Sequence, residues 1–179
     1  EGNRTIAIAG VPGDPMINYV GAASGGLWKT IDGGVTWKPI FDEQSASSIG
    51  SIAIAPSRTD DVWVGTGETF IIRPAHAMGD GIYKSEDAGK TWTHMGLEKT
   101  GRIGRVVVHP TNPDIVYVAA LGHTFGPQED RGVYKTTDGG ETWISYPIQS
   151  DSFRFITDIS VVNESNIWAV TAYDGQILF

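Results

Sequence analysis

Short runs of apolar residues, each bounded by turn-forming residues, recur along this chain of 179 residues. Ile52-Ala-Ile-Ala55 and Val106-Val-Val108 are apolar at nearly every position, where a half-exposed strand would alternate with polar residues. Each run precedes a turn rich in Pro, Asn or Asp, and then a second strand that carries an aromatic residue. Strands without alternation are typical of sheets that are covered on both faces. The pattern therefore predicts an all-β fold of short, doubly buried strands.

One segment of the chain occurs three times, which points to a repeat architecture. Its copies run from Leu27, Ile82 and Val133 and end at Trp37, Trp92 and Trp143, tryptophans that are separated by 55 and 51 residues. The strand–turn–strand pattern upstream of each copy occurs a fourth time, in residues 159–168. We therefore divide a single domain, residues 1–179, into units 4–48, 49–102 and 103–155 and a partial unit, 156–179.

Each full unit is expected to form four short strands. In the second unit these are residues 51–55, 62–66, 81–85 and 91–95. Four strands per repeat of this length are the pattern of a β-propeller blade. We predict a propeller segment of about three and a half four-stranded blades, which is an incomplete ring. A β-sandwich is the alternative, but it would not explain why the same turn recurs in register.

The recurring turn has the pattern Ser/Thr-x-Asp-x-Gly-x-Thr-Trp. Asp and Ser/Thr side chains accept hydrogen bonds from nearby backbone N–H groups, and Gly allows a positive φ. Trp then begins the next strand and buries a large ring between blades. We expect structural roles for all nine residues; calcium binding, the alternative, needs more oxygen ligands than the turn offers. They are Asp32, Gly34, Trp37, Asp87, Gly89, Trp92, Asp138, Gly140 and Trp143.

The three turns resemble the Asp-box (BNR) repeat family of β-propellers at every defining position. The segments 21–30, 64–68 and 109–122 further resemble bacterial secreted proteins described as sortilin-like or glycosyl hydrolase-like. The resemblance covers residues 4–149, whereas the tail has Asn163-Glu-Ser-Asn166 in place of the proline turn. The family includes sialidases, xyloglucan-specific endoglucanases and sortilin-type receptors. The resemblance implies a secreted, cell-surface or periplasmic bacterial protein.

Composition excludes several classes of function. The formal net charge of −8 argues against binding to nucleic acid or to anionic membrane surfaces. The absence of cysteine excludes disulfides, a cysteine nucleophile and thiolate metal sites. No apolar run approaches the ~20 residues of a membrane-spanning helix, and no spacing of His, Asp and Glu suggests a metal site, so we expect no metal and no cofactor. Because the chain begins with Glu1, we expect a processed or excised segment.

Two long loops between second and third strands depart from the repeat, and both are predicted on one face of the disc. They span Glu68–Asp80 and Gly122–Arg131. A carboxylate pair with a histidine suits acid–base chemistry, which makes Glu68 and Asp130 the catalytic candidates. The loops' candidates for ligand binding are Arg73, His76, Asp80, His123, Glu129 and Arg131. The alternative is a solvated polar loop that only caps the disc.

Arginines stand where the inner strands begin on that same face. They are Arg4, Arg102, Arg105 and Arg154. Guanidinium groups at the mouth of the channel would suit bidentate capture of a carboxylate. The resemblance implies a parallel, since sialidases hold a substrate carboxylate with arginines and sortilin-type propellers hold a peptide terminus. Ordinary ion pairing in an acidic chain is the alternative, and His94 and His109 are expected to be packing or surface residues.

The catalytic pattern of sialidases is largely missing. Ile72-Arg-Pro74 lacks the middle residue of their Arg-Ile-Pro motif, and no Tyr/Glu nucleophile pair is assigned. We therefore predict a non-catalytic binding or scaffolding segment that presents its loop-rich face to a protein or a glycan. The alternative is part of a sialidase-like or endoglucanase-like glycoside hydrolase completed by other blades. A third possibility is pure architecture, with further blades supplied by the same chain or by another copy.

Overall fold

The fold comes from a computed structural model of the chain. The structure describes residues 4–69, 77–123, 128–147, 155–163, 166–172 and 177–178. Beyond residue 154, side chains are described only at positions 159 and 160. Arg73, His76 and Arg154 lie outside the described residues.

The described strands form four antiparallel sheets, each built in chain order. The first sheet holds β1 (Thr5–Val11), β2 (Asp14–Ala22), β3 (Leu27–Thr30) and β4 (Lys38–Pro39). The second holds β5 (Ile49–Ala55), β6 (Arg58–Thr66), β7 (Ile82–Ser85) and β8 (Thr93–His94). The third holds β9 (Ile103–Val108), β10 (Val116–Ala120), β11 (Gly132–Thr136) and β12 (Ile144–Pro147), preceded by a short 3₁₀ helix η1 (Glu98–Thr100). The fourth has three strands, β13 (Phe155–Asn163), β14 (Asn166–Ala172) and β15 (Ile177–Leu178).

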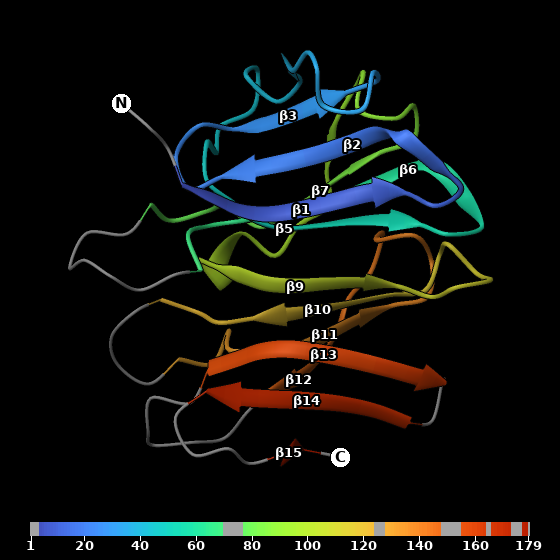
Figure 1. The fold of residues 1–179 in the computed structure, drawn as a ribbon. Coiled ribbons are helices and arrows are strands. Elements are labelled where there is room, and N and C mark those ends of the chain that lie inside the picture. Colours follow the sequence, from blue (N-terminus) through green and yellow to red (C-terminus); the bar gives the residue numbers. More distant parts are fainter. Residues whose placement is uncertain are drawn as a thin grey trace.

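The first strands of the four sheets lie side by side in the order β1, β5, β9 and β13 (Figure 1). The other strands of each sheet extend outward from this inner row, so the sheets are arranged as successive blades. Trp37, Trp92 and Trp143 belong to three different blades. The predicted all-β propeller segment is confirmed, and a sandwich is excluded.

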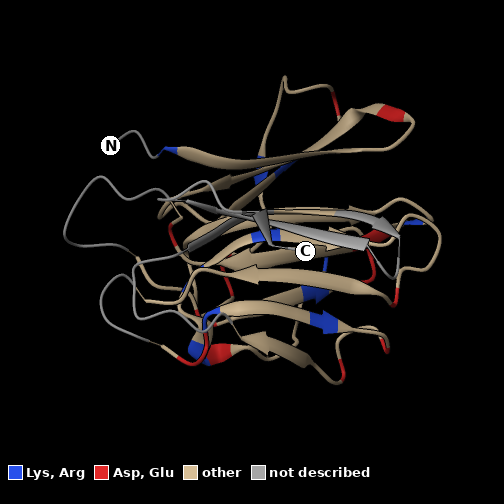
Figure 2. Cartoon of the chain, turned by 90° about the horizontal axis from the view of Figure 1, so that it is seen from below, with Lys and Arg blue, Asp and Glu red and all other residues tan. Residues whose placement is uncertain are grey.

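The second strand of blade 2 is longer than predicted. It begins at Arg58, because Ala55 pairs directly with Arg58 across a turn of only two residues. The sequence Arg58-Thr-Asp-Asp61 looks like a polar loop, but it continues the strand beyond the apolar segment that starts at Val62. Most of the Asp and Glu residues lie at strand ends and in turns, whereas the strands themselves are largely uncharged (Figure 2).

The hydrophobic core lies between neighbouring sheets. Blade 1 contributes Tyr19 and Phe41 to the cluster that it shares with blade 2. Blade 2 contributes Trp63 to the cluster that it shares with blade 3. Because blades 2 and 3 have a neighbouring blade on each face, their strands need apolar residues at consecutive positions. Gly21 and Gly65 permit this close packing, since a Cβ on either would lie 2.5 Å and 2.3 Å from the side chains of Ile49 and Ile103.

Two of the three Asp-box tryptophans join their blade to the blade before it. The indole Nε1 of Trp92 donates to the Ile40 carbonyl at 2.7 Å, and that of Trp143 donates to the Met95 carbonyl, also at 2.7 Å. The two acceptors stand at equivalent positions, each three residues after the tryptophan of its own blade. Trp37 instead donates to Gly34 within its own turn, at 3.1 Å.

The substitution Trp92→Phe tests this link between blades. It leaves the Ile40 carbonyl without its donor and removes part of a packed ring, so we expect a loss of about 1–3 kcal/mol in the free energy of unfolding. Trp37→Phe is the matched control, and it should change the free energy by less than about 0.5 kcal/mol because its indole is partly exposed. Urea unfolding measures both variants, and equal losses would contradict the role of the interblade hydrogen bond.

Candidate functional site

The three Asp boxes form the same hydrogen-bonded turn. In the first, Asp32 accepts from Thr36 twice, from the backbone N–H at 2.9 Å and from Oγ1 at 2.6 Å. The Thr30 hydroxyl donates to Asp32 at 2.7 Å and accepts from the Gly34 N–H at 2.9 Å. Gly34 has a φ of 95°, a left-handed conformation that favours glycine. Asp87 and Asp138 accept the same set of bonds.

These hydrogen bonds stabilise the ionised carboxylates. Thr36 and Thr30 lower the pKa of Asp32 to about 2, and Thr91 and Ser85 lower the pKa of Asp87 to about 2. The pKa of Asp138 is lowered by the hydroxyls of Thr136 and Thr142. The turn thus uses the acceptor capacity of each carboxylate, which supports structural roles for the three aspartates. Among the residues that the structure describes, no three His, Asp or Glu side chains are grouped to hold a metal ion.

The Asp boxes give stability a defined pH dependence. An unfolded Asp has a pKa of about 3.9, so a folded pKa of about 2 contributes stability above about pH 4 that is lost as the pH falls towards 2. Asp87→Asn should flatten this part of a plot of melting temperature against pH. The control is Asp42→Asn at an exposed position outside the turns, which should leave the slope unchanged; an unchanged slope in Asp87→Asn would contradict the assignment.

The two long loops follow β6 and β10, the second strands of blades 2 and 3. In Figure 1 the second strands β2, β10 and β14 all end at the same edge of the row of sheets. At the start of the first loop, Glu68 is 7% exposed and forms a salt bridge with Arg4, from the beginning of blade 1. The Glu68 N–H donates to the Ala77 carbonyl at 2.8 Å, which closes the base of the loop. The structure therefore brings together one carboxylate and one arginine that the sequence suggested separately.

Asp80 ends the same loop inside a network of hydroxyl groups. Its carboxylate accepts from the Tyr83 hydroxyl at 2.8 Å and from Ser45, which lies in the connection from blade 1 to blade 2. Its backbone N–H donates to Thr66 Oγ1 at 2.9 Å. Burial raises the pKa of Tyr83, so this phenol stays protonated and keeps donating. The sequence did not identify Ser45 or Tyr83, because only the fold brings them to Asp80.

Two buried arginines hold the ends of the second loop. Arg102 Nε donates to the Gly122 carbonyl at 2.8 Å, and Arg131 donates to the carbonyls of Leu121 and His123 at 2.9 and 3.1 Å. Arg102 is fully buried and Arg131 is 3% exposed. Burial and the neighbouring Arg131 lower the pKa of Arg102 to about 10, so it remains charged at neutral pH. Both guanidinium groups thus bind the backbone of the loop.

The remaining candidates lie nearer to solvent. His123 and Glu129 are exposed and Asp130 is half-buried, so all three are accessible positions among the described residues of the second loop. Arg105 is exposed on β9, in a groove along the inner strands that Ile8 and Ile52 also line. His94 contacts the Asp80 carbonyl, and its ring lies 4.7 Å from that of Tyr83, which is a packing role.

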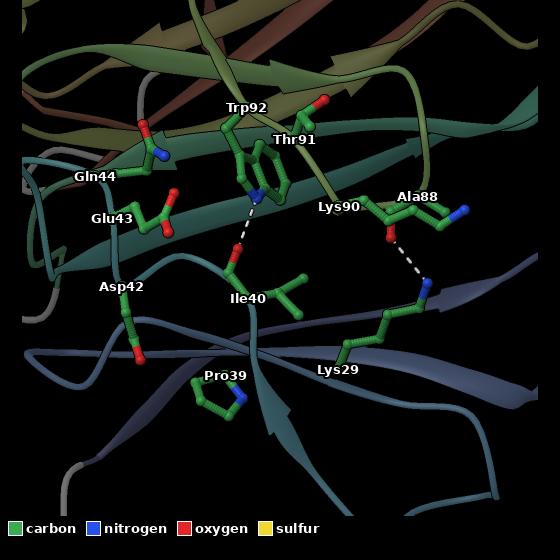
Figure 3. A pocket seen from close by; sticks show the side chains of 11 residues that line it. Lys29, Pro39, Ile40, Asp42, Glu43, Gln44, Ala88, Lys90, Thr91 and Trp92 are labelled. Atoms are coloured by element: carbon green, nitrogen blue, oxygen red, sulfur yellow. Dashed lines mark hydrogen bonds between the residues drawn. The ribbon is translucent and has the colours of Figure 1, made fainter.

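A groove of about 530 Å³ lies between blades 1 and 2 (Figure 3). Lys29 reaches across it and donates to the Ala88 carbonyl at 2.8 Å. A similar groove of about 400 Å³ separates blades 2 and 3, with Lys84 in the equivalent place. Lys29, Lys84 and Lys135 each lie 5.3 Å from the ring centroid of Tyr19, Trp63 and Tyr117, respectively. Because the groove recurs, it belongs to the contact between blades.

The fold and the turns define an Asp-box β-propeller segment. The family model Sortilin-Vps10, described as "Sortilin, neurotensin receptor 3", matches residues 25–176. The chain belongs to this family.

Known proteins similar to the chain include enzymes and a peptide-bound protein. Xyloglucanase Xgh74A of Acetivibrio thermocellus is 27% identical over 88% of this chain and 22% of its own length. An ancestral GH74 enzyme has a TM-score of 0.72 at 24% identity, covering 94% of this chain and 22% of the enzyme. YCF48 bound to D1 peptide has a TM-score of 0.60 at 16% identity, and the match covers 95% of this chain and 48% of that protein. The chain thus spans about one fifth of the length of the curated relative.

Proposed function

We propose that this segment is a non-catalytic, ligand-binding part of a secreted or cell-surface bacterial propeller, and that its loop-rich face binds a protein or a glycan. The observation that carries the proposal is the way in which the two long loops are held. The first loop runs from the buried Glu68 to the half-buried Asp80, and the buried Arg102 and Arg131 hold the ends of the second loop. On the second loop, His123 and Glu129 remain exposed. A rigid base with exposed polar side chains is the usual construction of a binding loop on a repeat scaffold.

The anchors also argue against catalysis by Glu68. A general acid needs access to substrate, but this carboxylate is buried beside the cationic Arg4. The salt bridge already engages the Glu68 carboxylate. Glu68 therefore suits a structural role at the base of the loop better than proton transfer.

The kinds of ligand follow from the proteins to which the chain is similar. Its relatives include xyloglucanases, whose name denotes a glycan, and one protein of the same fold is described with a bound peptide. A membrane-spanning helix, long and apolar enough for that role, does not occur among the described residues. The net charge of −8 favours ligands that are neutral or basic.

Binding is tested by isothermal titration of the protein with xyloglucan oligosaccharides and with a panel of basic peptides. For a ligand that binds, the double variant His123→Ala/Glu129→Ala should raise the dissociation constant by about tenfold or more, since both side chains are exposed on the loop face. The control Glu141→Ala lies on an Asp-box turn at the other face and should bind normally. The absence of any ligand, or equal binding by both variants, would contradict the proposal.

Similarity to xyloglucanases favours a second candidate, a glycoside hydrolase completed by other blades. Asp130, half-buried beside the second loop, is then the more accessible acid. If the protein hydrolyses a chromogenic xyloglucan oligosaccharide, Asp130→Asn should lower kcat by about 100-fold or more while Glu129→Gln retains activity. Unchanged kcat in Asp130→Asn and in Glu68→Gln would reject both carboxylates as catalysts.

A further inference from the structure

The two long loops meet at Gly101, in the connection from blade 2 to blade 3. From the first loop, the Gly79 N–H donates to the Gly101 carbonyl at 2.8 Å. From the second loop, the imidazole ring of His123 lies against Gly101, since a Cβ added there would be 3.3 Å from three atoms of that ring. The loops leave different blades, yet their described ends share one support. They therefore present one continuous surface.

Glycine makes this meeting of backbones possible. Gly101 has a φ of 66° and Gly67, at the end of β6, has a φ of 97°, and both values favour glycine. A Cβ on Gly67 would lie 2.5 Å from the Gly101 carbonyl oxygen, the same oxygen that accepts from the Gly79 N–H. Because these residues carry no side chain, the base of the first loop packs directly on the start of blade 3.

His123 is held through its backbone while its side chain stays exposed. Its N–H donates to the Gln128 Oε1 at 2.6 Å, and its carbonyl accepts from Arg131 at 3.1 Å. The ring itself is exposed and rests with one side on Gly101. A side chain on a fixed backbone loses little conformational freedom when a ligand covers it.

Met78 supplies an apolar group on the same surface. It is 40% exposed and directly precedes Gly79, whose N–H is bound to Gly101. On its other side, the bond from the Glu68 N–H to the Ala77 carbonyl closes the loop. The backbone is thus fixed on both sides of Met78, while the unbranched thioether side chain is free to adapt to an apolar partner.

These side chains favour a protein ligand over a glycan. The loops Glu68–Asp80 and Gly122–Arg131 contain neither tryptophan nor tyrosine, the residues whose apolar ring and polar tip match the mixed surface of a sugar. Methionine, in contrast, is enriched at protein interfaces. Glu129 is exposed on the second loop, and its carboxylate is complementary to a basic residue of the ligand.

We propose that Met78 and His123 form the centre of the binding surface, and that the ligand is a protein segment with an apolar side chain beside a basic one. The apolar side chain packs on Met78, and the basic residue lies near Glu129. This inference rests on the proposed function, and it selects a protein over a glycan. Burial of the exposed part of Met78 supplies a hydrophobic driving force for binding.

NMR of the methionine methyl groups tests the location of the ligand. The chain has three methionines, so isotope-labelled methyl groups give three signals, which the variants Met16→Leu, Met78→Leu and Met95→Leu assign. The probes are capped pentapeptides, Gly-Lys-X-Lys-Gly with leucine, phenylalanine or serine at X, and a xyloglucan heptasaccharide. We expect the leucine and phenylalanine peptides to shift the Met78 signal alone, and the serine peptide to bind about tenfold more weakly or less.

Isothermal titration with the leucine peptide tests the side chain itself. Met78→Gln should raise the dissociation constant by about tenfold or more. The matched control is Met16→Gln, whose side chain is 48% exposed beside the first Asp box and which should bind normally. Circular dichroism confirms that both variants are folded.

The outcomes separate this inference from the proposed function. A peptide that binds without moving the Met78 signal, or that binds both variants equally, would overturn the inference and leave the proposed function standing. A heptasaccharide that shifts the Met78 signal when the peptides do not would have the same meaning. Binding of none of the probes, together with no binding in the wider panel, would overturn both.

Discussion

The fold depends on one contact that recurs between neighbouring blades. An indole N–H from one Asp box donates to a backbone carbonyl of the preceding blade, and Lys29 and Tyr19 of that preceding blade donate back to the Ala88 carbonyl in the turn. These bonds satisfy polar groups at the rim of an otherwise apolar interface. Since the turn is held rigid by its own Asp and Thr side chains, it presents both the donor and the acceptor in fixed positions.

The same rigidity keeps the Asp-box carboxylates engaged inside their turns. The aspartates of the repeat are occupied within their own turns, and their low pKa values reflect hydrogen bonds to threonine and serine hydroxyls. The long loops at the opposite face are the part that varies from blade to blade. The ends of these loops are held by contacts of Glu68, Asp80, Arg102 and Arg131. The exposed side chains of the loops can therefore differ between blades while the loop ends stay in place.

Burial changes how the charged residues of the loops are interpreted. Arg102 and Arg131 have the residue type expected for carboxylate capture, yet they donate hydrogen bonds to the backbone carbonyls of three consecutive residues, 121–123. Glu68 has the residue type expected for an acid catalyst, yet it is paired with Arg4. In both cases the side chain stabilises the loop, and the accessible positions His123 and Glu129 are the better candidates for ligand contact.

The sequence by itself determined the repeat, the blades and the structural role of the Asp boxes. The Asp-box bonds join residues at most four positions apart, so a local pattern such as Thr30-x-Asp32-x-Gly34 is enough to reveal them. Only the tertiary structure decided which charges are buried and which loop residues remain accessible. Arg4 and Glu68, or Ser45 and Asp80, are distant in sequence and meet because neighbouring blades place them at one edge.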